Sequence, residues 1–237
     1  MNVPCGGKRV AFFGGSFDPP HLGHLAVARA ARAALSLDTV YFAPVGGQPL
    51  KPHGATASFQ DRVEMTRLAI AGEPGFCLSL ADAPKAGGVP NYSFDTLFAL
   101  RSELSPESNL FCLMGADSFL ALRHWRRSAE IPFVAPLIVA SRPGQPLDDL
   151  RAALPAGLTM EIEPAQPDCA DIEVRLWALL NQAGERAPFY LLPGLNVDVS
   201  ASQIRDQART SGDGLFAGAQ VLPTAVSEYI RAHGLYL

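Results

Sequence analysis

GGSFDPPHLGH, residues 14–24, is the segment that decides the fold. It follows a short apolar run at 9–13 and leads into an alanine-rich stretch of helical length at 22–35, so it should join a strand to a helix. Gly14 and Gly15 allow the backbone to turn tightly and to approach a ligand closely. In an open α/β sheet, ligands bind at the carboxyl ends of strands, where the N–H groups of the following helix favour an anion. The segment therefore predicts a phosphate-binding turn.

Short apolar runs alternate with amphipathic stretches of helical length through the first 140 residues, which is typical of βαβ units. We predict a Rossmann-like, doubly wound parallel α/β sheet. The predicted strands are residues 9–13, 39–43, 76–80, 110–114, 137–140 and 189–192. The predicted helices between them are residues 22–35, 59–71 and 93–104, the last with Ser93 as its cap.

Residues 144–188 break this alternation. They contain several prolines and an acidic patch at Asp168 and Asp171, and their apolar pattern predicts a helix at 172–182. We expect this region to be an insertion or a lid.

Two further helices are predicted near the end of the sequence, at 202–210 and at 224–233, and they should pack over the end of the sheet. The expected organisation is a single domain over 1–237. Within it, 144–188 is the insertion and 200–237 is a C-terminal helical part.

Composition excludes several classes of protein. The 237 residues are 48% hydrophobic, which is enough for one sizeable core. Lys and Arg total 19 against 23 Asp and Glu, a net charge of −4, so we expect no nucleic-acid partner and no attraction to an anionic membrane. No apolar stretch is long enough for a membrane span or a secretion signal, and we expect a cytoplasmic protein.

The four cysteines, Cys5, Cys77, Cys112 and Cys169, lie far apart and lack the spacing of a zinc site. We expect them to be buried free thiols in a reducing compartment.

His21 and His24 are three residues apart at the expected helix start, so both imidazoles can project towards one phosphate group. Hydrogen bonds from them would be strongest where negative charge grows in a transition state. The glycines match neither the P-loop pattern nor G-x-G-x-x-G, which argues against a P-loop kinase and an ordinary dinucleotide-dependent dehydrogenase.

GGSFDPPHLGH resembles the signature of the nucleotidyltransferase superfamily that carries an HxGH motif in a Rossmann-like sheet. VSASQIR, residues 199–205, is similar to the ISSTxIR segment of that superfamily, whose hydroxyls and arginine hold the phosphates of ATP. Ala201 and Ser202 stand where serine and threonine are usual. Ser202 suits a helix cap, and Arg205 suits a phosphate partner one turn further on.

Outside 144–188, the chain most resembles the nicotinate mononucleotide adenylyltransferases. NYSFDTL, residues 91–97, is similar to their S-Y-T-x-D-T-L turn, which implies that Tyr92 and Ser93 bind the pyridine carboxylate. Trp125 matches the aromatic residue that stacks on the nicotinate ring.

Two more segments carry the resemblance. GADS, residues 115–118, is similar to the family's G-A-D, which implies that Asp117 contacts the ATP side. Arg142 opens a segment similar to the family's R-P-G and is implied to contact phosphate.

One segment departs from the family pattern. After the second strand the family has Pro-His followed by a basic residue, whereas this chain reads QPLKPH at 48–53. Lys51 keeps the basic residue and is implied to bind substrate, but Leu50 stands at the histidine position. Whether His53 compensates is left open.

The resemblance implies two binding sets, with His21, His24 and Arg205 as the catalytic residues. The implied ATP site is Gly14, Gly15, Ser16, Phe17, His21, His24, Gly115, Asp117, Ser200, Ser202, Ile204 and Arg205. The implied mononucleotide site is Ser16, Lys51, Tyr92, Ser93, Trp125 and Arg142. Mg²⁺ is expected to be held through the ATP phosphates and not by a protein cage.

The implied reaction is transfer of AMP from ATP to nicotinate mononucleotide, which gives deamido-NAD and pyrophosphate in NAD biosynthesis. Two alternatives within the superfamily are transfer to nicotinamide mononucleotide and transfer to phosphopantetheine, although the phosphopantetheine enzymes usually have threonine where His21 stands. A third is a catalytically silent nucleotide-binding regulator, against which the intact His21, His24 and Arg205 argue. The sequence leaves the oligomeric state open.

Overall fold

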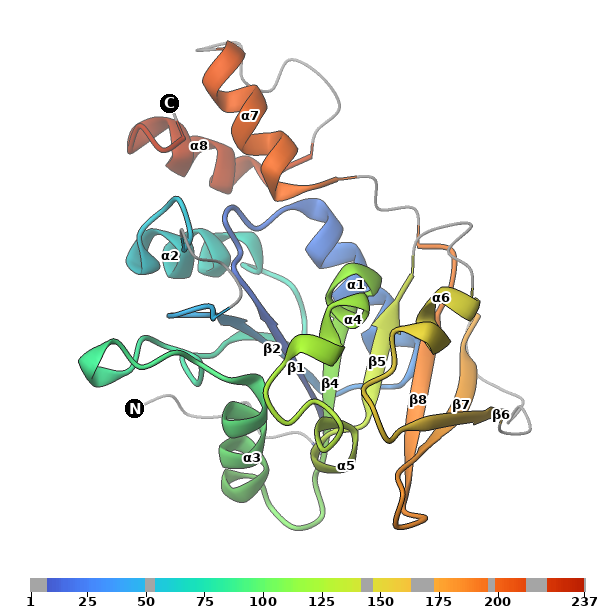
Figure 1. Ribbon diagram of the computed structural model, residues 1–237. Coiled ribbons are helices and arrows are strands. Elements are labelled where there is room, and N and C mark those ends of the chain that lie inside the picture. The colour runs from blue at the N-terminus through green and yellow to red at the C-terminus, as the bar shows by residue number, and fades with distance from the viewer. Residues whose placement is uncertain are drawn as a thin grey trace.

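The computed structural model describes residues 8–49, 54–141, 147–162, 173–195, 199–211 and 221–236. Its centre is one eight-stranded sheet in the order β3-β2-β1-β4-β5-β8-β7-β6 (Figure 1). The six parallel strands are β1 Arg9–Gly15, β2 Thr39–Pro44, β3 Phe76–Leu78, β4 Asn109–Gly115, β5 Leu137–Ala140 and β8 Arg186–Leu192. Every predicted strand is present, and the Rossmann-like fold is confirmed.

Side chains of β1 alternate between two cores, as the two-residue period of a strand requires. Val10 and Phe12 face a core built with α3 Ser93–Glu103, while Ala11 and Phe13 face a core built with α1 Leu22–Ala34. Three shorter helices accompany α3 in the first core or lie beside it: α4 Ala116–Leu120, α5 Ile131–Val134 and α6 Leu147–Ala152. Helices therefore cover both faces of the sheet, and the polar site is left to the strand ends.

A third apolar cluster joins α2 Phe59–Ala69, α7 Ala201–Ser211 and α8 Thr224–Ala232, which lie together at one side of Figure 1. We call it the α2/α7/α8 cluster; it consists of Ala57, Met65, Ala69, Ile204, Ala208, Leu222, Val226, Ile230 and Tyr236. The expected packing of the C-terminal helices over the sheet end is confirmed. Two single 3₁₀ turns, Ala86–Gly88 and Leu122–His124, complete the described elements.

The helix predicted at 172–182 is wrong. Residues Arg175–Leu180 form β7, which pairs antiparallel with β8 and with β6 Thr159–Ile162. Asn181 starts a tight turn, because its side-chain oxygen accepts bonds from the N–H groups of Ala183 and Glu185 at 3.0 Å each, and Gly184 has a φ of 80°. That turn folds an apolar run, equally suited to helix or strand, back onto the sheet.

Two further expectations concern the cysteines and membrane-spanning helices. Of the described cysteines, Cys112 is a free, buried thiol as expected, but Cys77 is in a disulfide, so a free thiol there is wrong. In the described ranges, none of the helices has the length and apolar character needed to cross a membrane.

Candidate active site

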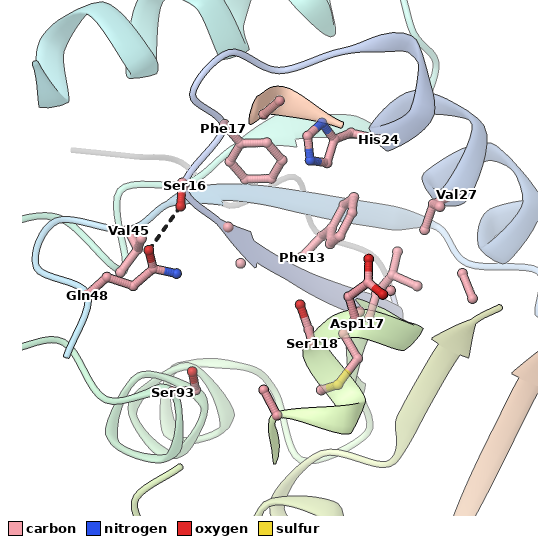
Figure 2. Close-up of a pocket in the computed structure, with 18 of the residues that line it drawn as sticks. Phe13, Ser16, Phe17, His24, Val27, Val45, Gln48, Ser93, Asp117 and Ser118 are labelled. Carbon is pink, nitrogen blue, oxygen red and sulfur yellow. Dashed lines mark hydrogen bonds between the residues drawn. The ribbon is translucent and has the colours of Figure 1, made fainter. Parts of the chain in front are cut away.

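A cavity of about 570 Å³ opens at the carboxyl ends of β1 and β4. It gathers fourteen of the predicted site residues from four separate stretches of chain. They are Gly14, Gly15, Ser16, Phe17, His21, His24, Tyr92, Ser93, Gly115, Asp117, Trp125, Ser200, Ser202 and Arg205. Figure 2 shows Ser16, Phe17 and His24 on one side of this space and Ser93 on the other.

Three predicted positions lie elsewhere or cannot be placed. Ile204 is 2% exposed, and its side chain lies in the α2/α7/α8 cluster and not in the cavity. Lys51 and Arg142, together with Leu50 and His53, fall outside the described residues.

The turn after β1 is tightly packed. A Cβ added to Gly14 would lie 2.7 Å from the Phe12 ring, so a larger residue would displace that ring. Phe17 has a φ of 47°, in the left-handed region that is unfavourable for residues other than glycine. Its ring packs edge-on against Phe13 at 5.6 Å between centroids, and this burial offsets the backbone strain. The turn is thereby fixed in one shape, and its residues line the cavity.

His21 and His24 form one unit at the start of α1. The backbone N–H of His21 donates to Nδ1 of His24 at 3.1 Å, and the two rings stack at 3.7 Å between centroids. Burial, and then the neighbouring His21, hold the pKa of His24 well below its usual value. Because Nδ1 accepts a bond, the neutral ring carries its proton on Nε2. His24 is therefore built to donate a hydrogen bond.

The lowered pKa of His24 gives a prediction about stability. Below about pH 6.5 the unfolded chain binds a proton at His24 that the native state resists, so the free energy of unfolding should fall with decreasing pH. Urea titrations at pH 7.5 and 5.5 should show a smaller fall in His24→Ala than in the wild type. Burial raises the pKa of Asp82, which acts with the opposite sign in both proteins and cancels in the comparison. An equal fall in the two proteins would contradict the lowered pKa.

The start of α7 carries a cationic side chain, that of Arg205. Nη1 of Arg205 donates to the carbonyl of Asp18 at 2.7 Å, and Nη2 donates to Oγ of Ser202 at 3.1 Å. The cap is Ser200, whose Oγ accepts from the N–H of Gln203 at 3.2 Å, so the expectation that Ser202 caps this helix is wrong. Ser202 instead orients Arg205, and both residues line the cavity.

The start of α4 brings a carboxylate to the opposite wall. Gly115 is the N-cap and Asp117 lies in the first turn; Figure 2 shows Asp117 and Ser118 side by side. Within the described ranges, no group of three or more His, Cys, Asp or Glu side chains is arranged to hold a metal ion.

The start of α3 and Trp125 form the far end of the cavity. The N-cap is Tyr92 and not the expected Ser93, and within the described chain it makes no side-chain capping bond. Ser93 is the first helical residue and lines the cavity, as does the half-buried Trp125. The first N–H groups of α3 are thus available to a ligand.

Arg126 and Asn91 complete this end and were not predicted. The Arg126 guanidinium lies 4.8 Å from the centroid of the Tyr92 ring and 3.1 Å from the Asp95 carboxylate. Buried Asn91 accepts from the N–H of Gly47 and donates to the carbonyl of Ala83, both at 2.9 Å, which ties two loops together. Asn91 is the first residue of the NYSFDTL segment, but the sequence does not show that its side chain is buried and joins these two loops.

Comparisons with known proteins identify the family of the chain. The model of the cytidylyltransferase-like family matches residues 12–207. The proteins called "Probable nicotinate-nucleotide adenylyltransferase" from Gloeobacter violaceus and Laribacter hongkongensis are each 38% identical to the chain. The alignments cover 97% of this chain and 97% of the first protein, and 96% of this chain and 94% of the second. The chain belongs to the nicotinate-nucleotide adenylyltransferases of the cytidylyltransferase-like family.

The family membership confirms the resemblance read from the sequence. Among solved structures, the chain is similar to the Plasmodium falciparum nicotinic acid mononucleotide adenylyltransferase complexed with NaAD, with a TM-score of 0.67 at 15% identity. That match covers 97% of this chain and 98% of the other. Because the identity is so low, the match supports the fold of the chain and nothing more.

Proposed function

We propose that the protein transfers AMP from ATP to nicotinate mononucleotide and releases deamido-NAD and pyrophosphate. One observation carries the proposal: the starts of α1, α3 and α7 all open on a single cavity of about 570 Å³. Helix starts favour anions. The reaction presents the phosphates of ATP, the phosphate of the mononucleotide and the pyridine carboxylate, and these anions match the three helix starts.

In the proposed reaction the mononucleotide phosphate attacks the α-phosphorus of ATP. A new P–O bond forms there, the bond to the β-phosphate oxygen breaks, and its electron pair leaves with pyrophosphate. No protein nucleophile is required, so catalysis consists of positioning and charge stabilisation. His21 and His24 would donate to the oxygens that gain charge, and Arg205 would neutralise the leaving pyrophosphate.

Magnesium bound to the phosphate oxygens of ATP is part of the proposal. The ion prefers oxygen ligands and keeps several waters, so it does not need a protein cage. The residues fit such an ion, because the oxygens of Ser16, Asp117 and Ser118 face the cavity. Bound there, it would reduce the negative charge on the phosphates.

The test is pyrophosphate release with ATP, magnesium and a panel of acceptors. We expect turnover with nicotinate mononucleotide, much less with nicotinamide mononucleotide and none with phosphopantetheine. Turnover with phosphopantetheine alone would reassign the enzyme. ATP binding without turnover on any acceptor would favour the silent regulator.

Trp125 provides a test of the pyridine end. If its ring stacks on the pyridine, Trp125→Ala should raise KM for the mononucleotide about fivefold, a cost of about 1 kcal/mol, and change KM for ATP much less. Trp125→Phe keeps an aromatic face and should lose less. Steady-state kinetics on both variants checks this. General unfolding of Trp125→Ala would instead identify Trp125 as a packing residue.

A further inference from the structure

The carboxylate of Asp18 lies within the turn that carries the two histidines, yet it faces away from solvent. Asp18 is 4% exposed. Its Oδ2 accepts from the N–H of Thr56 at 2.6 Å, and its Oδ1 accepts from the N–H of Ala57 at 3.1 Å and from the hydroxyl of Tyr236 at 2.7 Å. Nη1 of Arg205 lies 4.0 Å from Oδ2 and adds an ion pair. A buried carboxylate held in this way is a fixed anchor, because loss of one donor leaves an acceptor site of a buried charge unpaired.

Tyr236 reaches this carboxylate from a distant part of the sequence, 218 residues further on. It follows α8, whose end is closed by a bond from the N–H of Leu235 to the carbonyl of Ile230 at 3.0 Å. Its ring belongs to the α2/α7/α8 cluster and is 6% exposed. Burial, and then the bond to Asp18, raise the pKa of the Tyr236 hydroxyl, so it remains a donor at physiological pH.

The backbone of the same turn is held by two arginines from this cluster's helices. Nη1 of Arg62, on α2, donates to the carbonyl of Ser16 at 2.7 Å. Nη1 of Arg205, on α7, donates to the carbonyl of Asp18 at 2.7 Å. Residues 16–21, which we call the β1–α1 loop, are thus attached to α2, to α7 and, through Tyr236, to the segment after α8.

We propose that Tyr236 is a positioning residue for adenylyl transfer, whose hydroxyl fixes Asp18 and thereby the β1–α1 loop. The loop ends at His21, and the Asp18 carbonyl orients Arg205, so one displaced carboxylate would move both of the groups that we propose to contact the phosphates of ATP. This inference rests on the proposed function, since it concerns the rate of that reaction.

Tyr229 provides a matched control. Its hydroxyl donates to Oδ1 of Asp61 at 3.0 Å, which is the same kind of bond, made between α8 and α2. Neither Tyr229 nor Asp61 is among the described residues that line the cavity. Tyr229→Phe and Tyr236→Phe therefore each remove one tyrosine–carboxylate bond near the same helices, but only Tyr236→Phe releases the β1–α1 loop.

The experiment measures kcat, KM for ATP and melting temperature for the wild type and both variants, well below the lowest melting temperature. We expect Tyr236→Phe to lower kcat about tenfold and to change KM for ATP less than about threefold, because small misplacement of reacting groups acts mainly on the transition state. Tyr229→Phe should keep kcat within about twofold of the wild type. Equal kcat values for the two variants would overturn the inference.

A second variant, Asp18→Ala, removes both acceptor oxygens and keeps the inference testable even if Tyr236→Phe does not fold. It should show at least the same fall in kcat with little change in KM for ATP. Where both fold, adding Tyr236→Phe to Asp18→Ala should lower kcat less than about twofold further, because both changes break one connection. Two effects that multiply would contradict the inference. An inactive wild type would overturn the proposed function, so the two failures are distinguishable.

Discussion

His24→Ala should lower kcat for adenylyl transfer by on the order of 10² or more, with the fold and ATP binding nearly intact. His24 accepts at Nδ1 from the N–H of His21, which leaves Nε2–H to donate to a phosphate oxygen. Burial, and then His21, hold its pKa low, so the ring donates as a neutral group over the working range of pH. A donor that is most effective where charge develops contributes to kcat more than to substrate binding.

The measurement is steady-state kinetics with ATP and nicotinate mononucleotide, together with circular dichroism of the variant. His233→Ala is the matched control, since that imidazole stacks on Tyr229 at 3.9 Å between centroids and does not line the cavity. An unchanged kcat in His24→Ala would remove His24 from the catalytic set.

Nicotinate mononucleotide should be preferred to its amide by about tenfold to a few hundredfold in kcat/KM. The start of α3 presents N–H groups to the cavity, because within the described chain Tyr92 makes no side-chain capping bond. A carboxylate accepts two such bonds with charge assistance. The amide has one carbonyl acceptor, and it turns its NH₂ group towards groups that are themselves donors.

Two charged neighbours strengthen this expectation. Asp95 could have repelled a carboxylate, but it pairs with Arg126 at 3.1 Å and is not among the described residues that line the cavity. Arg126 does line it and adds a cation at the pyridine end. Comparing kcat/KM for the two mononucleotides at one fixed ATP and magnesium concentration decides the matter. Equal kcat/KM values would show that the start of α3 does not select the carboxylate, even if the protein does transfer AMP.

The sequence predicts the parallel sheet and the turn after β1 because both depend on local signals. Apolar runs, adjacent glycines and a helix start follow one another directly in residues 9–35. The strand at Arg175–Leu180 is misread as a helix because a short apolar run suits both structures, and pairing with β8 decides between them.

The supporting contacts of the site could not be predicted. Whether Ser200 or Ser202 caps α7, and whether Ser93 or Tyr92 caps α3, depends on backbone angles that the residue types leave open. The bond between Asp18 and Tyr236 joins residues 218 positions apart, and no periodicity relates such positions. Tertiary packing alone brings them together.

The connection between Asp18 and Tyr236 also sets the order in which the site is completed during synthesis. A ribosome releases the chain from its N-terminal side, and segments fold as they emerge. The β1–α1 loop is therefore translated early, but its carboxylate lacks the tyrosine donor until residue 236 has been added and has left the exit tunnel. A nascent chain that stalls before this point can form most of the sheet without a fully anchored β1–α1 loop.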